Sequence, residues 1–372
     1  MLSSIVHMKH VVFLVSVAFK KPGGGAKVIL EYANRLSRDG VKVTMMYSSS
    51  LFFKEASMAL KIRMILRYWY NLITGRYTCG SWFRKEDAVD EKWVWSLEQS
   101  YAPCADCYIA TSVETASFLD AYNISADRKF YFIQGFEDWV PGFDAKKVIE
   151  TYHYNLNKIV ISSWLQKIVE HEGLACVKVP NGFDFKEFKC VKSSSKREPC
   201  MVAMLYNTNP AKGMEYSFEA LDIVKKRFPQ LQVNVFGVHP RPAGMPGWYN
   251  YYQSPDKERL NWIYNNSAVY VATSINEGWG LTVGEAMICG CAVVCTNAKG
   301  FLEMAEDGKN ALITPIKDAV ATADAVIKLI EDEALREMLV GNALQSVREY
   351  DIEKSYKMFR TNILDNVVQD NK

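Results

Sequence analysis

The chain has 372 residues, of which 49% are hydrophobic and 23% are charged. These proportions are typical of a globular protein, and they exclude a disordered, collagenous or coiled-coil chain. The 44 basic and 42 acidic residues leave a net charge of +2, which argues against nucleic acid as a partner because nucleic-acid-binding proteins usually carry a strong basic excess.

Apolar runs and helical periodicity alternate along residues 1–184, which we expect to form an N-terminal domain. The apolar run over residues 11–17 predicts a buried first strand rather than a signal peptide, since no small-residue cleavage site follows it. Glycines at residues 23–25 end this run, and apolar residues then recur at helical spacing over residues 28–36. Strands are predicted over residues 11–17, 41–46, 107–111, 129–134 and 158–162.

A stretch of poor periodicity and mixed charge over residues 185–199 predicts a linker, and a second alternating series follows over residues 200–350. Strands are predicted there over residues 200–206, 231–237, 269–273 and 292–296, and helices over residues 214–228, 257–265 and 285–288 and from residues 318, 333 and 352. Alternating strands and helices predict parallel sheets covered by helices. We therefore expect an α/β fold with two doubly wound Rossmann-like domains facing each other across a cleft. Residues 351–372 are expected to form a C-terminal helix that packs back toward the first domain.

The most informative stretch is EGWGLTVGE over residues 277–285, in which Glu277 and Glu285 flank a loop with three glycines. Glycine lets a ligand approach the backbone closely. A helix predicted to begin near Glu285 offers unpaired N–H groups to phosphate. The alternative is a surface turn with two solvated acids, against which the apolar flanking segments argue.

Residues 277–294 resemble the signature E-G-F/W-G-L-x-x-x-E-A-M-x-x-G-x-P-V-V of glycosyltransferase family 4, with Ala292 in place of the usual proline. Residues 179–184 (VPNGFD), 211–213 (AKG) and 300–312 (GFLEMAEDGKNAL) resemble further motifs of the family. Residues 131–137 (YFIQGFE) resemble the bacterial branch that includes rhamnosyltransferases. The resemblance extends to almost the whole chain, and it implies the GT-B architecture and transfer from a nucleotide sugar with retention of anomeric configuration.

The resemblance also implies a role for each matching residue. Glu277 would contact the transferred sugar, Glu285 would bind the ribose hydroxyls of the donor, and Lys212 would neutralise the diphosphate leaving group. Backbone amides would hold the sugar hydroxyls and the diphosphate, and they belong to Gly278, Trp279, Gly280, Leu281 and Thr282. Gly24 and Gly25 would let the first domain approach the same phosphates.

The chain departs from the family at several charged positions. Tyr206 and Asn207 stand near the place of an arginine that usually neutralises the diphosphate. Lys27, His239 and Arg241 are candidates for that charge, and the alternative is that each is ordinary loop or surface structure. No D-x-D occurs, which predicts that no metal and no other cofactor takes part.

Two further departures concern the first domain. Thr111, Ser112 and Glu114 stand where the family often has a histidine. Glu137, Asp138 and Trp139 follow a predicted strand, where they would face the acceptor or would simply be solvated loop residues.

Residues 51–85 carry seven basic residues and one acidic residue. Within them, a predicted helix over residues 55–73 has an apolar face opposite Arg63 and Arg67. That face consists of Met58, Ile62, Ile65, Trp69 and Leu72. A basic amphipathic helix of this kind lies on anionic membrane surfaces. The alternative is that the apolar face packs on the first domain.

The function predicted from these patterns is transfer of a sugar from a nucleotide-sugar donor to a glycan or lipid-linked acceptor in cell-surface polysaccharide biosynthesis. The odd number of cysteines, nine, predicts reduced thiols and a cytoplasmic protein. Within the cytoplasm, we expect a peripheral position on the inner face of the cell membrane. Two alternatives remain open: a nucleotide-sugar epimerase on the same scaffold, and a non-catalytic glycan-binding descendant of such an enzyme.

Overall fold

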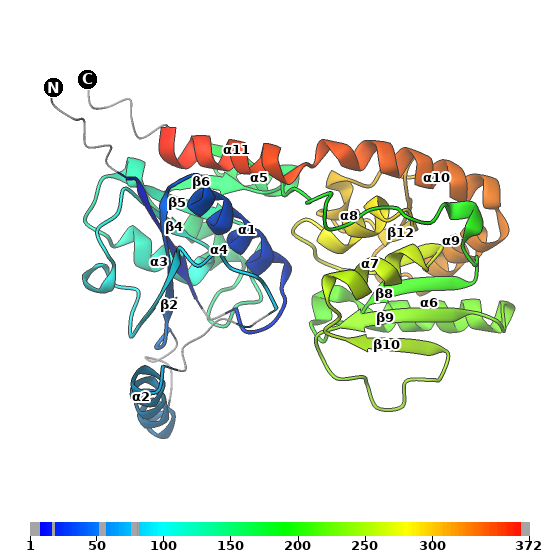
Figure 1. Ribbon diagram of the computed structural model, residues 1–372, viewed down its shortest axis with the longest axis horizontal. Coiled ribbons are helices and arrows are strands. Elements are labelled where there is room, and N and C mark those ends of the chain that lie inside the picture. Colours follow the sequence, from blue (N-terminus) through cyan, green and yellow to red (C-terminus); the bar gives the residue numbers. More distant parts are fainter. Residues whose placement is uncertain (1–7, 17–18, 52–56, 76–79, 81, 366–372) are drawn as a thin grey trace. The chain divides into compact units, whose positions relative to one another are not determined.

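The structure of the protein is a computed structural model that describes residues 8–16, 19–51, 57–75, 80 and 82–365. It divides into two compact units (Figure 1), one formed by Met1–Pro180 with Tyr356–Lys372 and the other by Asn181–Ser355. Residues 185–199, for which a linker was predicted, lie within the second unit. Among the residues described, no helix is long and apolar enough to cross a membrane.

The first unit is built on a seven-stranded parallel sheet with the strand order β3-β2-β1-β4-β5-β6-β7. Its strands are β1 (His10–Val15), β2 (Lys42–Ser48), β3 (Val89–Val94), β4 (Cys107–Ala110), β5 (Lys129–Ile133), β6 (Asn157–Val160) and β7 (Cys176–Lys178). Its helices include α1 (Gly24–Arg38), α2 (Met58–Ile73), α3 (Val113–Asp120), α4 (Ala145–Tyr152) and α5 (Ser163–His171). The predicted first strand is confirmed over residues 10–15, and residue 17 lies outside the described residues.

An aromatic cluster joins the end of the chain to the core of the first unit. Phe359 lies in α11 (Ile352–Arg360), and its ring stacks on Tyr32 of α1 at 4.5 Å between ring centroids. The same ring contacts Phe13 of β1 and Phe132 of β5. Burial of these rings adds apolar area to the core, so residues from the C-terminal end of the chain form part of the first unit.

The second unit contains a six-stranded parallel sheet with the strand order β10-β9-β8-β11-β12-β13. Its strands are β8 (Met201–Leu205), β9 (Gln232–Gly237), β10 (Tyr249–Gln253), β11 (Val269–Ala272), β12 (Ala292–Thr296) and β13 (Leu312–Thr314). Its helices are α6 (Met214–Arg227), α7 (Lys257–Asn265), α8 (Leu281–Ile288), α9 (Ala319–Glu331), α10 (Glu333–Ser346) and the first residues of α11. The predicted helix over residues 257–265 and the predicted strand over residues 292–296 are confirmed at both ends.

One predicted boundary in the second unit is wrong. The helix expected from Glu285 begins at Leu281, one turn earlier. Threonine, valine and glycine at residues 282–284 are weak helix formers, so the sequence pattern placed the start too late. Glu285 therefore lies in the second turn of α8, and the unpaired N–H groups of the helix start belong to residues before it.

The strand orders determine where loops can hold a ligand. In each sheet the order reverses once, between β1 and β4 in the first unit and between β8 and β11 in the second. Because neighbouring strands are parallel, the chain leaves adjacent strands in opposite directions at these points and opens a crevice at the carboxyl edge of the sheet. In the second unit this geometry brings the segments after β8 and β11 together.

Candidate functional site

The segments that follow β8 and β11 are joined by hydrogen bonds. Gly213 adopts a left-handed φ of +58°, and a side chain there would collide with the carbonyl oxygen of Thr273. The Thr273 hydroxyl donates to the Gly213 carbonyl at 2.8 Å, and the Ile275 N–H donates to the Ala211 carbonyl at 2.8 Å. Lys212 is therefore held beside the loop that begins the EGWGLTVGE motif.

Lys212 and Glu277 form an ion pair within this site. The Lys212 Nζ lies 2.7 Å from Glu277 Oε2, and the Ser274 hydroxyl donates to the same oxygen at 3.2 Å. The two side chains are 24% and 15% exposed, so a ligand can reach the pair while much of its hydration is removed. The structure thus brings together two residues that are 65 positions apart in the sequence.

The loop between Glu277 and α8 presents unpaired backbone donors. Gly280 precedes the helix with a left-handed φ of +95°. Within the described part of the chain, no backbone carbonyl accepts a hydrogen bond from the N–H groups of Trp279, Gly280, Leu281 or Thr282. Successive free N–H groups at a helix start form a site for an anion such as phosphate.

Two glycines of the motif are also explained by packing within the protein. A side chain at Gly280 would collide with the ring of Phe301, and one at Gly284 would collide with the ring of Phe183. Both rings are buried. These glycines therefore shape the loop and the helix whether or not a ligand is bound.

Glu285 lies in the interior of the second unit and is 5% exposed. Its Oε2 accepts a hydrogen bond from the hydroxyl of Tyr264 at 3.1 Å. Burial, and then the Glu285 charge, raise the pKa of Tyr264 well above its usual value. Burial also raises the pKa of Tyr270, to which the charges of Glu285 and Glu277 both contribute, so the two carboxylates of the motif lie near one buried phenol.

The two other predicted donor-binding side chains of this unit follow β9. The imidazole Nε2 of His239 lies 3.1 Å from the Thr208 hydroxyl, which is in the segment after β8. Arg241 donates to the carbonyl oxygens of Met245 and Pro246 in its own loop. His239 is therefore near the β8 side of the site, whereas Arg241 is engaged in holding its loop.

Gly24 and Gly25 belong to the first unit, where Gly24 begins α1. A side chain at Gly25 would lie 3.4 Å from the amide group of Gln134, which follows β5. The Oε1 of Gln134 is buried, and no residue in the described part of the chain forms a hydrogen bond with it. The carboxyl edge of this sheet thus exposes backbone at Gly24 and Gly25 and holds a polar side chain beside them.

Glu137 lies in the loop after β5, and it is not the solvated loop residue that one alternative predicted. Its Oε2 accepts a hydrogen bond from the Val113 N–H at 2.7 Å, at the start of α3. Burial raises the pKa of Glu137 to about 8, the Val113 N–H opposes this shift, and the charge of Glu114 adds to it. Trp139, in contrast, is 62% exposed.

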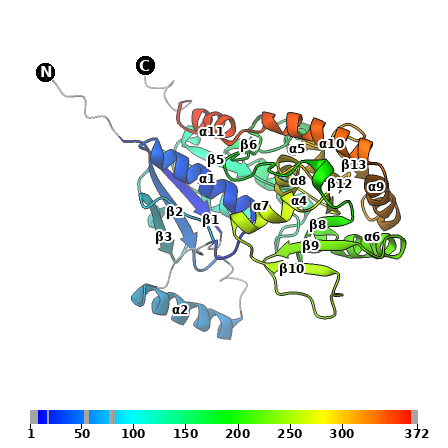
Figure 2. The same ribbon diagram turned by 45° about the vertical axis from the view of Figure 1, so that its right-hand side comes forward.

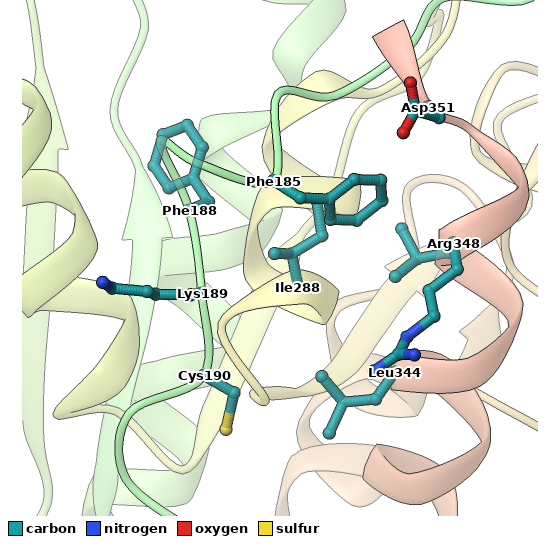
Figure 3. A pocket seen from close by; sticks show the side chains of 9 residues that line it. Phe185, Phe188, Lys189, Cys190, Ile288, Leu344, Arg348 and Asp351 are labelled. Atoms are coloured by element: carbon teal, nitrogen blue, oxygen red, sulfur yellow. The ribbon is translucent and has the colours of Figure 1, made fainter. Parts of the chain in front are cut away.

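A pocket of about 570 Å³ opens beside the C-terminal end of α8 in the second unit (Figure 3). Its lining consists of Phe185, Phe188, Lys189, Cys190, Ile288, Leu344, Val347, Arg348 and Asp351. None of the residues predicted for donor binding or catalysis lines this pocket, so it is distinct from the crevice at β8 and β11.

Comparison with known proteins agrees with this geometry. Residues 185–346 match the family model described as glycosyl transferases group 1. The chain is 27% identical over 216 residues to a phosphatidyl-myo-inositol mannosyltransferase of Mycolicibacterium smegmatis, covering 55% of this chain and 56% of that protein. The chain spans little more than half the length of the first curated relatives that it matches.

Solved structures resemble the chain over nearly its whole length. Sucrose-phosphate synthase from Thermosynechococcus elongatus aligns with a TM-score of 0.70 and 14% identity, covering 94% of this chain and 97% of that one. Anabaena HepE in complex with UDP-glucose aligns with a TM-score of 0.70 and 16% identity, covering 96% and 99%. At such identities the likeness concerns the fold.

Two parallel-sheet α/β units of this kind define the GT-B architecture, and the predicted fold class is confirmed. The match of residues 185–346 to the glycosyl transferases group 1 model, together with this fold, supports a GT-B glycosyltransferase. The narrower branch that includes rhamnosyltransferases stays a prediction, as do the roles of the individual site residues.

Proposed function

We propose that the protein transfers a sugar from a nucleotide-sugar donor to a glycan or lipid-linked acceptor in cell-surface polysaccharide biosynthesis, with retention of anomeric configuration. The observation that carries this proposal is the Lys212–Glu277 ion pair at 2.7 Å. It stands at the point where the strand order of the second sheet reverses, within the region that matches the glycosyl transferases group 1 model. The N–H groups of residues 279–282 follow it in the chain, and no backbone carbonyl of the described residues accepts a hydrogen bond from them.

Each group at this crevice has a chemical task in the proposed reaction. The N–H groups of residues 279–282 hold the donor diphosphate, and the Lys212 ammonium neutralises the charge that grows on it as the bond to the sugar breaks. Glu277 accepts hydrogen bonds from the transferred sugar, and Glu285 accepts them from the ribose. His239 lies on the β8 side of the same crevice, whereas the engagement of Arg241 with its own loop weakens its candidacy.

The proposed route is front-face attack. The bond between the anomeric carbon and the diphosphate oxygen breaks, the acceptor oxygen bonds to the same face of that carbon, and the acceptor proton passes to the departing phosphate oxygen. This route needs no protein nucleophile, so the protein contributes positioning and charge stabilisation. Lys212 and the backbone amides replace a bound metal in stabilising the leaving group.

The experiment that tests this function begins with thermal stabilisation by nucleotide sugars. A ligand at about 100 times its dissociation constant adds roughly 2.7 kcal/mol to the stability of the fold, which a melting curve detects. The nucleotide sugar that stabilises the protein is then incubated with lipid-linked and soluble glycan acceptors, with and without chelator, and the anomeric configuration of the product is determined by NMR.

The proposal expects acceptor-dependent release of the nucleoside diphosphate and a product with the donor's configuration, in both the presence and absence of chelator. An isomer of the nucleotide sugar formed without acceptor would identify an epimerase. The absence of any stabilising nucleotide sugar would favour a non-catalytic protein. An inverted product would refute retention alone, and loss of activity with chelator would refute the metal-independent mechanism alone.

We further propose that α2 binds an anionic membrane surface on the cytoplasmic side, where a lipid-linked acceptor is presented. None of the residues of α2 is buried, and the predicted apolar face is open to solvent. Its exposed fractions range from 38% at Ile65 to 74% at Met58. Both ribbon views show α2 apart from the other helices of its unit (Figures 1 and 2).

The surroundings of α2 support this proposal over packing in a core. The less exposed residues form a separate seam of Lys61, Met64, Tyr68 and Asn71, and Tyr68 contacts the ring of Trp95. The apolar face beside this seam remains uncovered, while Arg63 and Arg67 are exposed. Exposed apolar surface next to basic residues is what an interfacial helix presents to lipid. The Mycolicibacterium smegmatis relative is named a phosphatidyl-myo-inositol mannosyltransferase, and this name, which includes a lipid, also supports a lipid acceptor.

Vesicle sedimentation tests this assignment. The protein is expected to sediment with phosphatidylglycerol vesicles at low salt, less so as salt rises, and not with phosphatidylcholine vesicles. Replacing Arg63 and Arg67 by glutamate should release it. The matched control replaces Lys146 and Lys147, which are exposed on α4, by glutamate as well. This control should leave vesicle binding nearly unchanged. Failure of the wild-type protein to sediment, or equal loss in both double variants, would refute a membrane role for α2.

A further inference from the structure

We propose that Tyr264 is a positioning residue that orients Glu285 toward the ribose of the donor nucleotide. This inference rests on the proposed function, because the role of Glu285 in holding the ribose is part of that proposal. The inference adds to the site a residue that lies outside the EGWGLTVGE motif. It also predicts that the contribution of Tyr264 to nucleotide affinity depends on the ribose hydroxyls.

The contact that carries the inference joins two buried side chains from different helices. Tyr264 lies at the end of α7, and its hydroxyl donates to Glu285 Oε2 in α8 at 3.1 Å. The terminal torsion of a glutamate is broad, with no sharp preferred value. A carboxylate that receives the adjacent hydroxyls of a ribose must present its oxygens in one plane, so a hydrogen bond that fixes this torsion prepares the carboxylate for its ligand.

The Tyr264 ring is itself held by aromatic neighbours. Its centroid lies 5.4 Å from that of Phe236, 5.7 Å from that of Tyr270 and 6.1 Å from that of Phe188, all with edge-to-face geometry. Edge-to-face packing favours one orientation of a ring. The phenol hydroxyl therefore stands at a defined position relative to α8.

Arg197 fixes the two helix ends that carry this pair. Arg197 is 3% exposed, and its guanidinium donates to the backbone carbonyls of Tyr264 and Ser267 at 3.0 and 2.9 Å. The same guanidinium donates to the carbonyl of Cys289, at the C-terminal end of α8. One buried side chain thus joins the end of α7 to the end of α8, which limits how far Tyr264 and Glu285 can move apart.

This geometry predicts an effect that a purely structural tyrosine would not have. Loss of the Tyr264 hydroxyl removes one constraint on the orientation of the Glu285 carboxylate, which weakens its hold on the ribose hydroxyls and on no other part of the nucleotide. The affinity lost in Tyr264→Phe should therefore disappear when the ligand lacks those hydroxyls.

The experiment measures binding by calorimetry. UDP, GDP, ADP and CDP are screened on the wild-type protein, and the one that binds most tightly is compared with its 2′,3′-dideoxy form. Tyr264→Phe is expected to weaken binding of the ribonucleotide by about tenfold, as for loss of a hydrogen bond to a charged group, and to leave binding of the dideoxynucleotide within about twofold. In a Glu285→Ala background, Tyr264→Phe should change neither affinity further.

The matched control is Tyr249→Phe. Tyr249 is also buried in the second unit, and its hydroxyl has no hydrogen-bond partner among the described residues. The control should therefore leave both affinities unchanged. Melting temperatures of both variants establish that they are folded. Equal weakening of ribonucleotide and dideoxynucleotide by Tyr264→Phe, or unchanged binding of both, would overturn the role of Tyr264 while the proposed function stands. If none of the four nucleotides binds the wild-type protein, the proposed function itself fails.

Discussion

Replacement of Lys212 by methionine removes one ammonium group and keeps most of the apolar stem. In the structure this ammonium lies 2.7 Å from Glu277, and both side chains are partly exposed. Ion pairs that reach solvent contribute only about 0.2–1 kcal/mol to stability. A domain of this size loses about 2–4 °C of melting temperature per kcal/mol, so the melting temperature should fall by about 4 °C at most.

The effect on catalysis is expected to be much larger than the effect on stability. Removal of one positioned group that stabilises charge in the transition state costs about 10²–10³-fold in turnover, or about 2.7–4 kcal/mol. Because the charge on the diphosphate grows as its bond to the sugar breaks, Lys212→Met should lower kcat far more than it weakens donor binding.

The assay follows release of the nucleoside diphosphate under single-turnover and steady-state conditions, with donor affinity measured separately by calorimetry. The control is Lys309→Met, because Lys309 forms an ion pair with Glu306 at 2.9 Å on the surface of the same unit. That variant should keep wild-type turnover. A Lys212→Met protein that loses donor affinity but turns over at the wild-type rate would refute the leaving-group role and leave Lys212 with ground-state binding alone.

The other predictions concern three carboxylates. Glu285→Ala should weaken the binding of free nucleotide and of donor alike by about 10- to 100-fold, whereas Glu277→Ala should leave the binding of free nucleotide unchanged and lower turnover. Calorimetry measures the binding and a rate assay measures turnover. Unchanged nucleotide affinity in Glu285→Ala, or unchanged turnover in Glu277→Ala, would remove that residue from the site. The pKa of Glu137 is raised to about 8, so between the ordinary carboxyl pKa and pH 8 the folded state holds a proton that the unfolded state has lost. The contribution of Glu137 to stability therefore falls as pH rises through that range, by up to about 1.4 kcal/mol per pH unit. Glu137→Gln keeps an acceptor for the Val113 N–H and should lose less stability than wild type between pH 6 and 9 in denaturant titrations, and parallel curves for the two proteins would refute the raised pKa.

Local patterns in the sequence were sufficient to predict the central elements of both units. The continuous apolar runs that became β1, β4, β5, β8, β11 and β12 are buried strands, and such runs are typical of parallel sheets with both faces covered. The strands that local patterns do not predict all lie at the edges of the two sheets, and they are β3, β7, β10 and β13. Edge strands carry polar side chains and lack the continuous apolar run, so their pairing is decided by the neighbouring strand.

The motif residues were likewise found from sequence, but their mutual geometry was not. Nothing in the spacing of Lys212 and Glu277 shows that they touch. The contact arises because β8 and β11 are adjacent in the sheet, and strand order depends on interactions between distant parts of the chain. The same holds for Tyr264 and for Arg197. Arg197 lies in the stretch for which a linker was predicted, and its guanidinium is buried against backbone carbonyls.

The periodicity of residues 58–72 determined that an amphipathic helix forms there and which residues share its apolar face. It left open whether that face is covered, because helices packed on a core and helices lying on a membrane have the same 3.6-residue repeat. Only the tertiary structure decided that the apolar face of α2 is uncovered and that Glu137 is half-buried, with its carboxyl group bound to the Val113 N–H. Sequence patterns report which side chains a local element presents together, whereas burial depends on which distant segment packs against them.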